Sequence, residues 1–125
     1  MNKNTILIIE DELAILNNIC TILEISGYTC LKANSGLQAL QILETTTPDL
    51  ILCDVMMPEM NGFEVLQKLR ENAKTKTLLF CFLSARADIL DIDYGLSLGA
   101  NGYITKPFSA KDLVQTVQKL LPKNE

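Results

Sequence analysis

The sequence predicts an α/β protein built on a five-stranded, doubly wound parallel sheet with five helices. Five short apolar segments alternate with longer segments in which apolar residues recur at helical spacing. A regular alternation of strands and helices requires right-handed crossovers, which place helices on both faces of a parallel sheet. A length of 125 residues suits one ordinary domain, so residues 1–125 are expected to form a single unit.

The five apolar segments are expected to be strands. They are residues 6–9, 28–33, 50–53, 78–83 and 102–105. Three of them are apolar on both faces, as is typical of strands that helices cover from above and below. The second alternates, with Tyr28, Cys30 and Lys32 on one face and the intervening residues on the other. This pattern favours an edge strand.

The segments between the strands are expected to be helices at residues 13–25, 36–45, 63–70 and 88–98, with a last helix from Ser109 onward. Gly27 is expected to end the first helix, Ser109 and Asp112 to form a capping box for the last, and Pro122 to close it. The segment 88–98 has the weakest pattern. The side chains expected to form the apolar stripes are Leu13, Leu16, Ile19, Cys20, Leu23, Leu37, Leu40, Leu43, Phe63, Leu66, Leu69, Ile89, Ile92, Leu96, Leu113, Val114, Val117, Leu120 and Leu121.

Composition narrows the function classes. The net charge of −4 argues against direct binding to nucleic acid or to an anionic membrane. The absence of histidine excludes histidine metal ligands, histidine general bases and a phosphohistidine within the chain. The four cysteines show no CxxC spacing and are expected to be reduced, mostly buried thiols. With no apolar run of about 20 residues and no signal-peptide pattern, the chain is expected to be cytoplasmic.

Polar residues follow four of the five predicted strands. They are Glu10, Asp11 and Glu12 after the first, Asp54 after the third, Ser84 after the fourth and Lys106 after the fifth. Because ligands bind outside the carboxyl ends of the strands in such sheets, we expect these side chains to lie close together.

Such a cluster would suit a divalent cation and phosphoryl transfer. Two carboxylates about 5 Å apart repel by roughly 3 kcal/mol at an effective dielectric near 20. Lys106 would balance one of the charges of Glu10, Asp11 and Asp54, and a divalent cation would balance the other two. Oxygen ligands with access to water favour Mg²⁺. A carboxylate beside Mg²⁺, a lysine and a hydroxyl can form an aspartyl phosphate.

Six short motifs occur in order along the chain. They are IIEDE at residues 8–12, DLILCDVMMP at 49–58, MNGFE at 60–64, LSA at 83–85, LGANGY at 98–103 and TKPF at 105–108. Together they resemble the receiver domain of two-component response regulators over essentially the whole chain. The resemblance implies a flavodoxin-like fold with strand order 2-1-3-4-5 and a single receiver domain.

The resemblance also implies a metal site and a phosphoacceptor. Asp54 would be the phosphoacceptor and a metal ligand. Asp11 would bind Mg²⁺ directly, Glu10 through water or in part, and the backbone carbonyl of Met56 would be a further ligand. Glu12 is expected to support the first turn of the helix rather than to bind metal.

Other residues would sense the phosphoryl group. Lys106 would pair with its oxygens and is expected to precede a cis proline, Pro107. Ser84 would donate its hydroxyl, and Tyr103 would rotate toward the space that Ser84 leaves; plain core packing of Tyr103 remains an alternative. Arg86 is expected to be a solvated loop charge. Gly62 and Gly99 would serve backbone turns.

The implied function is a signalling switch in a two-component system or phosphorelay, not a classical enzyme. Because the chain has no histidine, a sensor histidine kinase or phosphotransfer protein would donate the phosphoryl group. Phosphorylation would shift the surface formed by residues 88–98, 102–105 and 109–121. That surface would control an output domain or effector, or a phosphorylation-dependent homodimer.

Two alternatives remain open at this point. The first is a binding module that no longer accepts phosphate, although the complete set of acids, hydroxyl and lysine speaks against it. The second is an enzyme of similar fold, either a haloacid-dehalogenase-like phosphatase or a flavodoxin. Met56 stands where such a phosphatase has its second aspartate, and the acids at residues 10–12 would repel a flavin phosphate.

Overall fold

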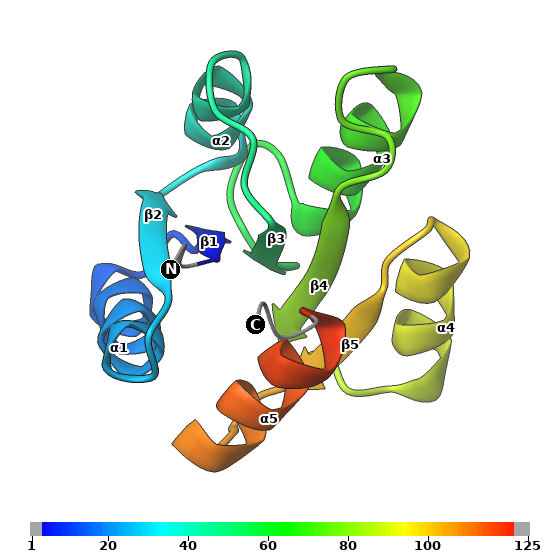
Figure 1. The fold of residues 1–125 in the computed structure, drawn as a ribbon. Helices are drawn as coiled ribbons and strands as arrows, with labels where there is room; N and C mark the ends of the chain where they lie inside the picture. The colour runs from blue at the N-terminus through cyan, green and yellow to red at the C-terminus, as the bar shows by residue number, and fades with distance from the viewer. Residues whose placement is uncertain (1–3, 122–125) are drawn as a thin grey trace.

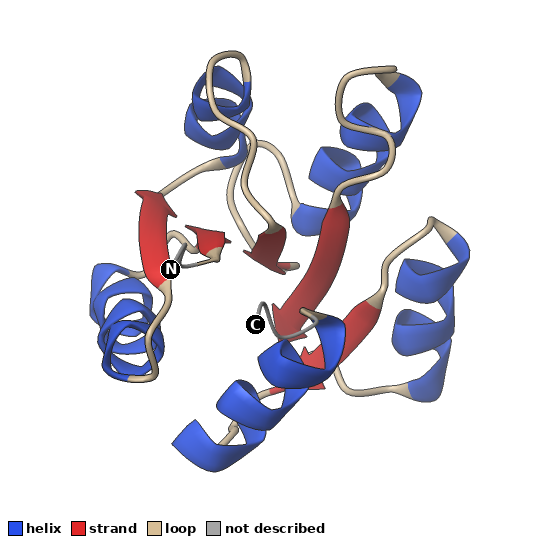
Figure 2. Cartoon of the chain, viewed as in Figure 1, coloured by secondary structure: helices blue, strands red, loops and turns tan. Residues whose placement is uncertain are grey.

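The computed structural model, which describes residues 4–121, has a five-stranded parallel sheet between two layers of helices (Figures 1 and 2). The elements are β1 (Thr5–Ile9), α1 (Leu13–Ile25), β2 (Thr29–Ala33), α2 (Gly36–Leu43), β3 (Leu50–Asp54), α3 (Gly62–Glu71), β4 (Leu79–Ser84), α4 (Ile89–Ser97), β5 (Gly102–Thr105) and α5 (Ala110–Leu120). The sheet order is β2-β1-β3-β4-β5, and all pairings are parallel. The predicted fold class and strand order are confirmed.

The two faces of the sheet form separate cores. On one face, Leu7, Ile51 and Phe80 pack with buried residues of α2 and α3. On the other face, Ile8 and Leu52 pack with buried residues of α1 and α5. Figure 1 shows α1 and α5 on one side of the sheet and α2, α3 and α4 on the other. Because each fully buried aliphatic side chain contributes about 1.5–3 kcal/mol, these cores hold the carboxyl ends of the strands in a fixed arrangement.

The strand predictions are confirmed, with one difference at the ends of β3 and β4. All five residues of β3 are buried, whereas β2 at the edge is mostly exposed or half-buried, as its alternation predicts. Asp54 and Ser84 are the last residues of β3 and β4 rather than the first residues of the following loops. Their backbones are therefore held by the sheet.

The helix ends follow the predicted signals. Ser109 Oγ accepts a hydrogen bond of 3.0 Å from Asp112 N, and Ser109 N donates one of 3.4 Å to the Asp112 carboxylate, so the capping box of α5 is confirmed. Gly27, with φ of +100°, follows α1 in the left-handed conformation expected of a terminating glycine. Pro122 lies outside the described residues.

The predicted apolar stripes are confirmed for α3 and α5, but four of the predicted stripe residues are exposed. Leu13 and Leu37 lie in the first turns of α1 and α2, which stand beyond the carboxyl edge of the sheet. Ile89 and Leu96 are exposed on α4, because this helix approaches the sheet through Gly95: a Cβ at Gly95 would lie 3.0 Å from a ring carbon of Phe82. The stripe predicted for residues 88–98 is therefore wrong at Ile89 and Leu96.

Two expectations about the whole chain can be compared with the described residues. All four cysteines are free thiols, and three of them are buried, as expected. Among residues 4–121, no helix combines the length and apolar character that a membrane span needs.

Arg70 of α3 joins two loops at the amino-terminal edge of β4. Its guanidinium donates hydrogen bonds to the carbonyl oxygens of Gly99, Lys76 and Leu78, the shortest being 2.7 and 2.8 Å, and to Asn101 Oδ1 at 3.4 Å. Gly99, with φ of +104°, serves the backbone turn predicted for it. Burial lowers the pKa of Arg70, but the planar guanidinium remains charged and fixes both loops.

Replacing Arg70 with lysine should lower the free energy of unfolding by about 1–2 kcal/mol, because an ammonium cannot reach all of these acceptors at once. Urea unfolding measures the change. The exposed neighbour Lys68, changed to alanine, is the control and should stay within about 0.5 kcal/mol of the wild type. Equal stabilities of the two variants would contradict the role given to Arg70.

Candidate functional site

The carboxyl edge of the sheet brings the predicted acids together. Glu10 follows β1, Asp11 follows Glu10, and Asp54 ends β3, the neighbour of β1. One carboxylate oxygen from each lies within 4.8 Å of those of the other two. Glu12 is not a member of this cluster: its side chain is exposed, and it stands at the amino-terminal cap of α1 without a side-chain capping bond.

Lys106 reaches into the cluster from the end of β5. Its Nζ lies 2.8 Å from Glu10 Oε1 and 3.4 Å from Asp54 Oδ2. Its backbone N–H donates a bond of 2.8 Å to the Ser84 carbonyl, and the peptide bond to Pro107 is cis, as predicted. Burial alone would lower the pKa of Lys106. The hydrogen bond with Glu10 and the charges of Asp54 and Glu10 outweigh burial and raise this pKa, so the ammonium stays charged.

The acids differ in how the protein holds them. Glu10 is fully buried, and its Oε2 accepts a bond of 3.2 Å from the backbone N–H of Glu12. Asp54 is 6% exposed, and its Oδ1 accepts a bond of 3.3 Å from the N–H of Met56. Burial, together with the side chain of Glu10, raises the pKa of Asp11 against the opposing effect of its own backbone N–H and of Lys106. The protein surroundings of Asp11 therefore favour its charged form less than water does.

The donor set fits a hard divalent cation. Three carboxylates and one ammonium leave two negative charges when all are ionised, and the clustered ligand atoms are oxygens. Oxygen-only sites suit Mg²⁺ better than zinc or copper. Burial is the main cause of the raised pKa of Asp11, and the charge of Glu10 adds to it; a bound cation would favour the charged carboxylate. The N–H of Met56 faces Asp54, which places the Met56 peptide beside the cluster.

Ser84 and Tyr103 meet at the loop that follows β4. Ser84 is fully buried, and its Oγ accepts a bond of 3.0 Å from the N–H of Arg86. The Tyr103 hydroxyl donates a bond of 2.6 Å to the carbonyl oxygen of Arg86, while its ring lies 5.7 Å from the ring of Phe82. Burial raises the pKa of Tyr103, and the neighbouring Ser84 partly offsets that rise. Both side chains therefore bond to the backbone of the same loop residue, Arg86.

The contacts of Arg86 and Gly62 could not be predicted from the sequence. Arg86, expected as a solvated loop charge, is half exposed, but it pairs with Asp91 of α4 at 2.9 Å and lies 3.8 Å from the Met56 sulfur. Gly62 donates its N–H to the Val55 carbonyl at 2.9 Å, and a Cβ on it would collide with the Asp54 carbonyl oxygen. Gly62 is needed for this close approach rather than for the turn predicted from the family.

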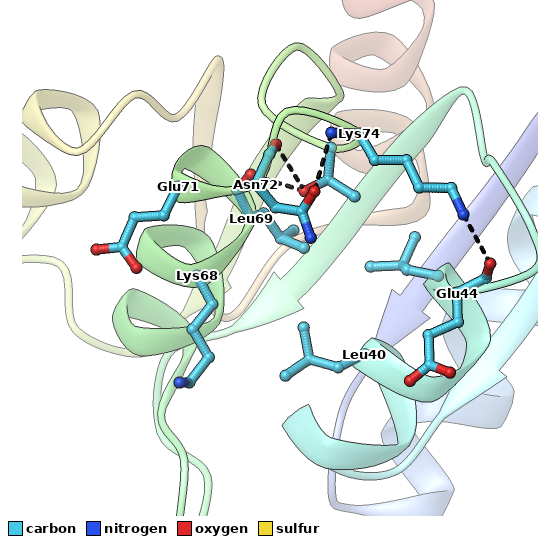
Figure 3. Close-up of a pocket in the computed structure, with 9 residues that line it drawn as sticks. Leu40, Glu44, Lys68, Leu69, Glu71, Asn72 and Lys74 are labelled. Carbon is cyan, nitrogen blue, oxygen red and sulfur yellow. Dashed lines mark hydrogen bonds between the residues drawn. The ribbon is translucent and has the colours of Figure 1, made fainter.

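A pocket of about 490 Å³ lies away from this site, where α2 and α3 end (Figure 3). It has an apolar lining from Leu40, Leu43 and Leu69. Lys74 lies at its rim and donates a bond of 2.9 Å to the Glu44 carbonyl. It shares no residue with the acidic cluster, so the chemistry of the carboxyl edge does not involve it.

Comparisons with known proteins agree with this geometry. The family model described as "Response regulator receiver domain" matches residues 6–118. The chain is 40% identical over 125 residues to the alkaline phosphatase synthesis transcriptional regulatory protein PhoP of Bacillus subtilis, covering all of this chain and 51% of PhoP. It is 38% identical over 121 residues to the phosphate regulon transcriptional regulatory protein PhoB of Pseudomonas aeruginosa, covering 97% of this chain and 53% of PhoB. The chain thus spans about half the length of these relatives.

Solved structures show the same fold. The chemotaxis protein CheY4 of Vibrio cholerae superposes with a TM-score of 0.91 at 28% identity, covering 96% of this chain and all of CheY4. A putative response regulator from Chloroflexus aurantiacus superposes with a TM-score of 0.90 at 34% identity, covering 95% of this chain and 98% of that one. The family match over most of the chain, together with these relatives, shows that the chain belongs to the receiver domains of two-component response regulators.

Proposed function

We propose that this receiver domain accepts a phosphoryl group on Asp54 from the phosphohistidine of a sensor histidine kinase or phosphotransfer protein. The observation that carries the proposal is the arrangement around Asp54: carboxylate oxygens of two further acids lie within 4.8 Å, and Lys106 Nζ lies 3.4 Å away. The chain itself contains no histidine, so the donor belongs to another protein or to another part of a longer one.

Glu10, Asp11, Asp54 and the backbone carbonyl of Met56 are the residues that would hold Mg²⁺. The oxygen donors and the uncompensated negative charge of the cluster support this assignment. When bound, Mg²⁺ would supply positive charge beside the phosphoryl oxygens.

The side chains of the domain would perform the transfer itself. A carboxylate oxygen of Asp54 forms the new bond to phosphorus as the phosphorus–nitrogen bond of the donor breaks, and the electron pair of that bond stays on the imidazole. Lys106, already 3.4 Å from Asp54, pairs with the transferred oxygens. Later attack by water returns the Asp54 carboxylate and releases phosphate, so the domain assists only its own phosphorylation and dephosphorylation.

The output would arise on the surface formed by α4, β5 and α5. A phosphoryl group on Asp54 attracts the Ser84 hydroxyl away from the Arg86 N–H, and Tyr103 shifts because its hydroxyl is bonded to the same loop. The adjacent α4 exposes Ile89, Leu90, Tyr94 and Leu96, an apolar surface suited to a partner.

Several properties of the whole protein belong to the same proposal. We propose that the chain acts as a single receiver domain in the cytoplasm, without binding nucleic acid or membrane itself. It would control an output domain or a separate effector, or a phosphorylation-dependent homodimer. The net charge of −4 supports the absence of direct nucleic-acid binding.

Labelling with acetyl phosphate tests the proposal. In the presence of Mg²⁺, the intact protein should gain the mass of one phosphoryl group, and chelation of the metal before labelling should prevent the gain. Peptide mapping should place the group within residues 33–68, the segment between Lys32 and Lys68 that contains Asp54. A protein that stays unlabelled under these conditions would instead be a module that no longer accepts phosphate.

Replacing Asp11 with asparagine should raise the free energy of unfolding of the metal-free protein by about 1 kcal/mol, since one like charge leaves the cluster. The same variant should lose the stabilisation that millimolar Mg²⁺ gives the wild type. Thermal unfolding with and without Mg²⁺ measures both effects. Asp93→Asn, on the exposed side of α4, is the control and should keep the response to Mg²⁺. An unchanged Mg²⁺ response in Asp11→Asn would remove Asp11 from the metal site.

A further inference from the structure

Two cysteines meet at the contact between α1 and the edge strand β2. Cys20 lies on the buried side of α1, and Cys30 lies on β2, paired in register with Ile6 of β1. The Cys30 thiol donates to the carbonyl oxygen of Cys20 at 3.8 Å, and both side chains pack in the same apolar cluster on this face of the sheet. The two residues are therefore in contact, although ten positions separate them in the sequence.

A side-chain hydrogen bond also joins α1 to β2 close to the two cysteines. Lys32 Nζ donates a bond of 2.9 Å to Asn17 Oδ1. Asn17 and Cys20 are three residues apart on α1, and Lys32 and Cys30 are two apart on β2, so each pair shares a face of its element. The turn at Gly27 connects the two elements, and Figure 1 shows α1 beside β2. The Lys32–Asn17 bond thus helps to keep α1 and β2 side by side where Cys20 and Cys30 meet.

The remaining cysteines have a different environment. Cys53 and Cys81 are fully buried in the central strands β3 and β4. Burial raises the pKa of Cys53, and it raises the pKa of Cys81 to about 12. The neighbouring Cys30 side chain lowers the pKa of Cys20 against the effect of burial, and Lys32 adds to this lowering, whereas Cys20 and burial raise the pKa of Cys30. Cys20 is therefore the thiol best able to react as a thiolate.

We propose that Cys20 and Cys30 are a modification site, at which a peroxide produces a reversible intramolecular disulfide that links α1 to β2. The edge position of β2 leaves Cys30 partly exposed, whereas Cys20 is 1% exposed, so a small oxidant enters past Cys30 to reach the Cys20 sulfur. The Cys20 thiolate attacks one peroxide oxygen, the oxygen–oxygen bond breaks, and hydroxide leaves and takes up a proton to form water. The Cys30 sulfur then displaces the hydroxyl of the resulting sulfenic acid, and the departing oxygen takes the Cys30 proton as water.

Peroxide treatment of the reduced full chain tests the proposal. The number of thiols that iodoacetamide alkylates after unfolding should fall from four to two, and the protein should remain a monomer on a non-reducing gel. Trypsin leaves both cysteines in one peptide, residues 4–32, and cleavage after Glu24 separates them. The two fragments should stay joined until a reductant is added.

Variants establish which thiols react. Cys20→Ser and Cys30→Ser should each abolish the joined fragments, whereas the control Cys81→Ala should retain them. The oxidised wild type should unfold at a higher urea concentration than the reduced protein, and dithiothreitol should reverse this change. Four alkylated thiols after peroxide, a disulfide that involves Cys53 or Cys81, or disulfide-linked dimers alone would each overturn the proposal. Because wild-type mapping decides the pairing, the result stands even where a variant fails to fold.

Discussion

Replacing Asp54 with asparagine should abolish labelling by acetyl phosphate, with a fall in the initial rate of at least about 100-fold. The amide keeps the size of the side chain, but its oxygen is neutral and a much weaker nucleophile. The change also removes one of the three charges that favour a cation and the ion pair with Lys106 at 3.4 Å. Intact-mass measurement at several times after addition of acetyl phosphate gives the rate.

The matched control separates this effect from a general change in charge. Asp93→Asn alters the net charge equally, but it lies on an exposed position of α4, so its labelling rate should match the wild type. Circular dichroism should show that both variants keep the wild-type helix content. Labelling of Asp54→Asn at the wild-type rate would place the phosphoacceptor elsewhere and would remove the basis of the proposed function.

The fold was predictable because nearly every element carries its own pattern. The apolar runs at β1, β3 and β4 have the length and two-sided burial of central strands, and the alternation at β2 indicates an edge. The prediction was wrong where tertiary placement decides burial. Leu37 follows the helical spacing, but it lies in the first turn of α2, beyond the sheet, and is 62% exposed.

The gathering of acids and Lys106 could also be predicted, because parallel strands bring their carboxyl ends to one edge. The contacts around the cluster could not. The ion pair of Arg86 and Asp91 joins the loop after β4 to α4. No sequence rule predicts this pair, because the distance between the two side chains depends on the loop conformation and on where α4 begins. The exposure of Ile89 depends on the close approach of Gly95 to Phe82, which periodicity does not report.

The backbone of Asp54 and Val55 packs directly against the backbone of Gly62. Gly62 begins α3, and its N–H donates a bond of 2.9 Å to the Val55 carbonyl. An added Cβ would collide with the Asp54 carbonyl oxygen and would lie 3.0 Å from the Val55 Cα. These are backbone atoms of β3 and of the residue that follows it, so no side-chain rotation can relieve the contact.

Gly62→Ala should therefore lower the free energy of unfolding by about 3 kcal/mol, near the upper end of the usual range for overpacking. It should also slow labelling, because the Asp54 backbone must move. Gly36→Ala is the matched control: Gly36 likewise begins its helix, but the added Cβ would meet the Met60 sulfur and a Val65 methyl at 2.9 Å. The flexible Met60 side chain can move, but the buried Val65 methyl must also shift, so this variant should lose about 1–2 kcal/mol, less than Gly62→Ala. Urea unfolding measures the free energy of unfolding of both variants. Equal losses in the two variants would show that the backbone beside Asp54 moves as easily as the side chains around Gly36, and would contradict the prediction.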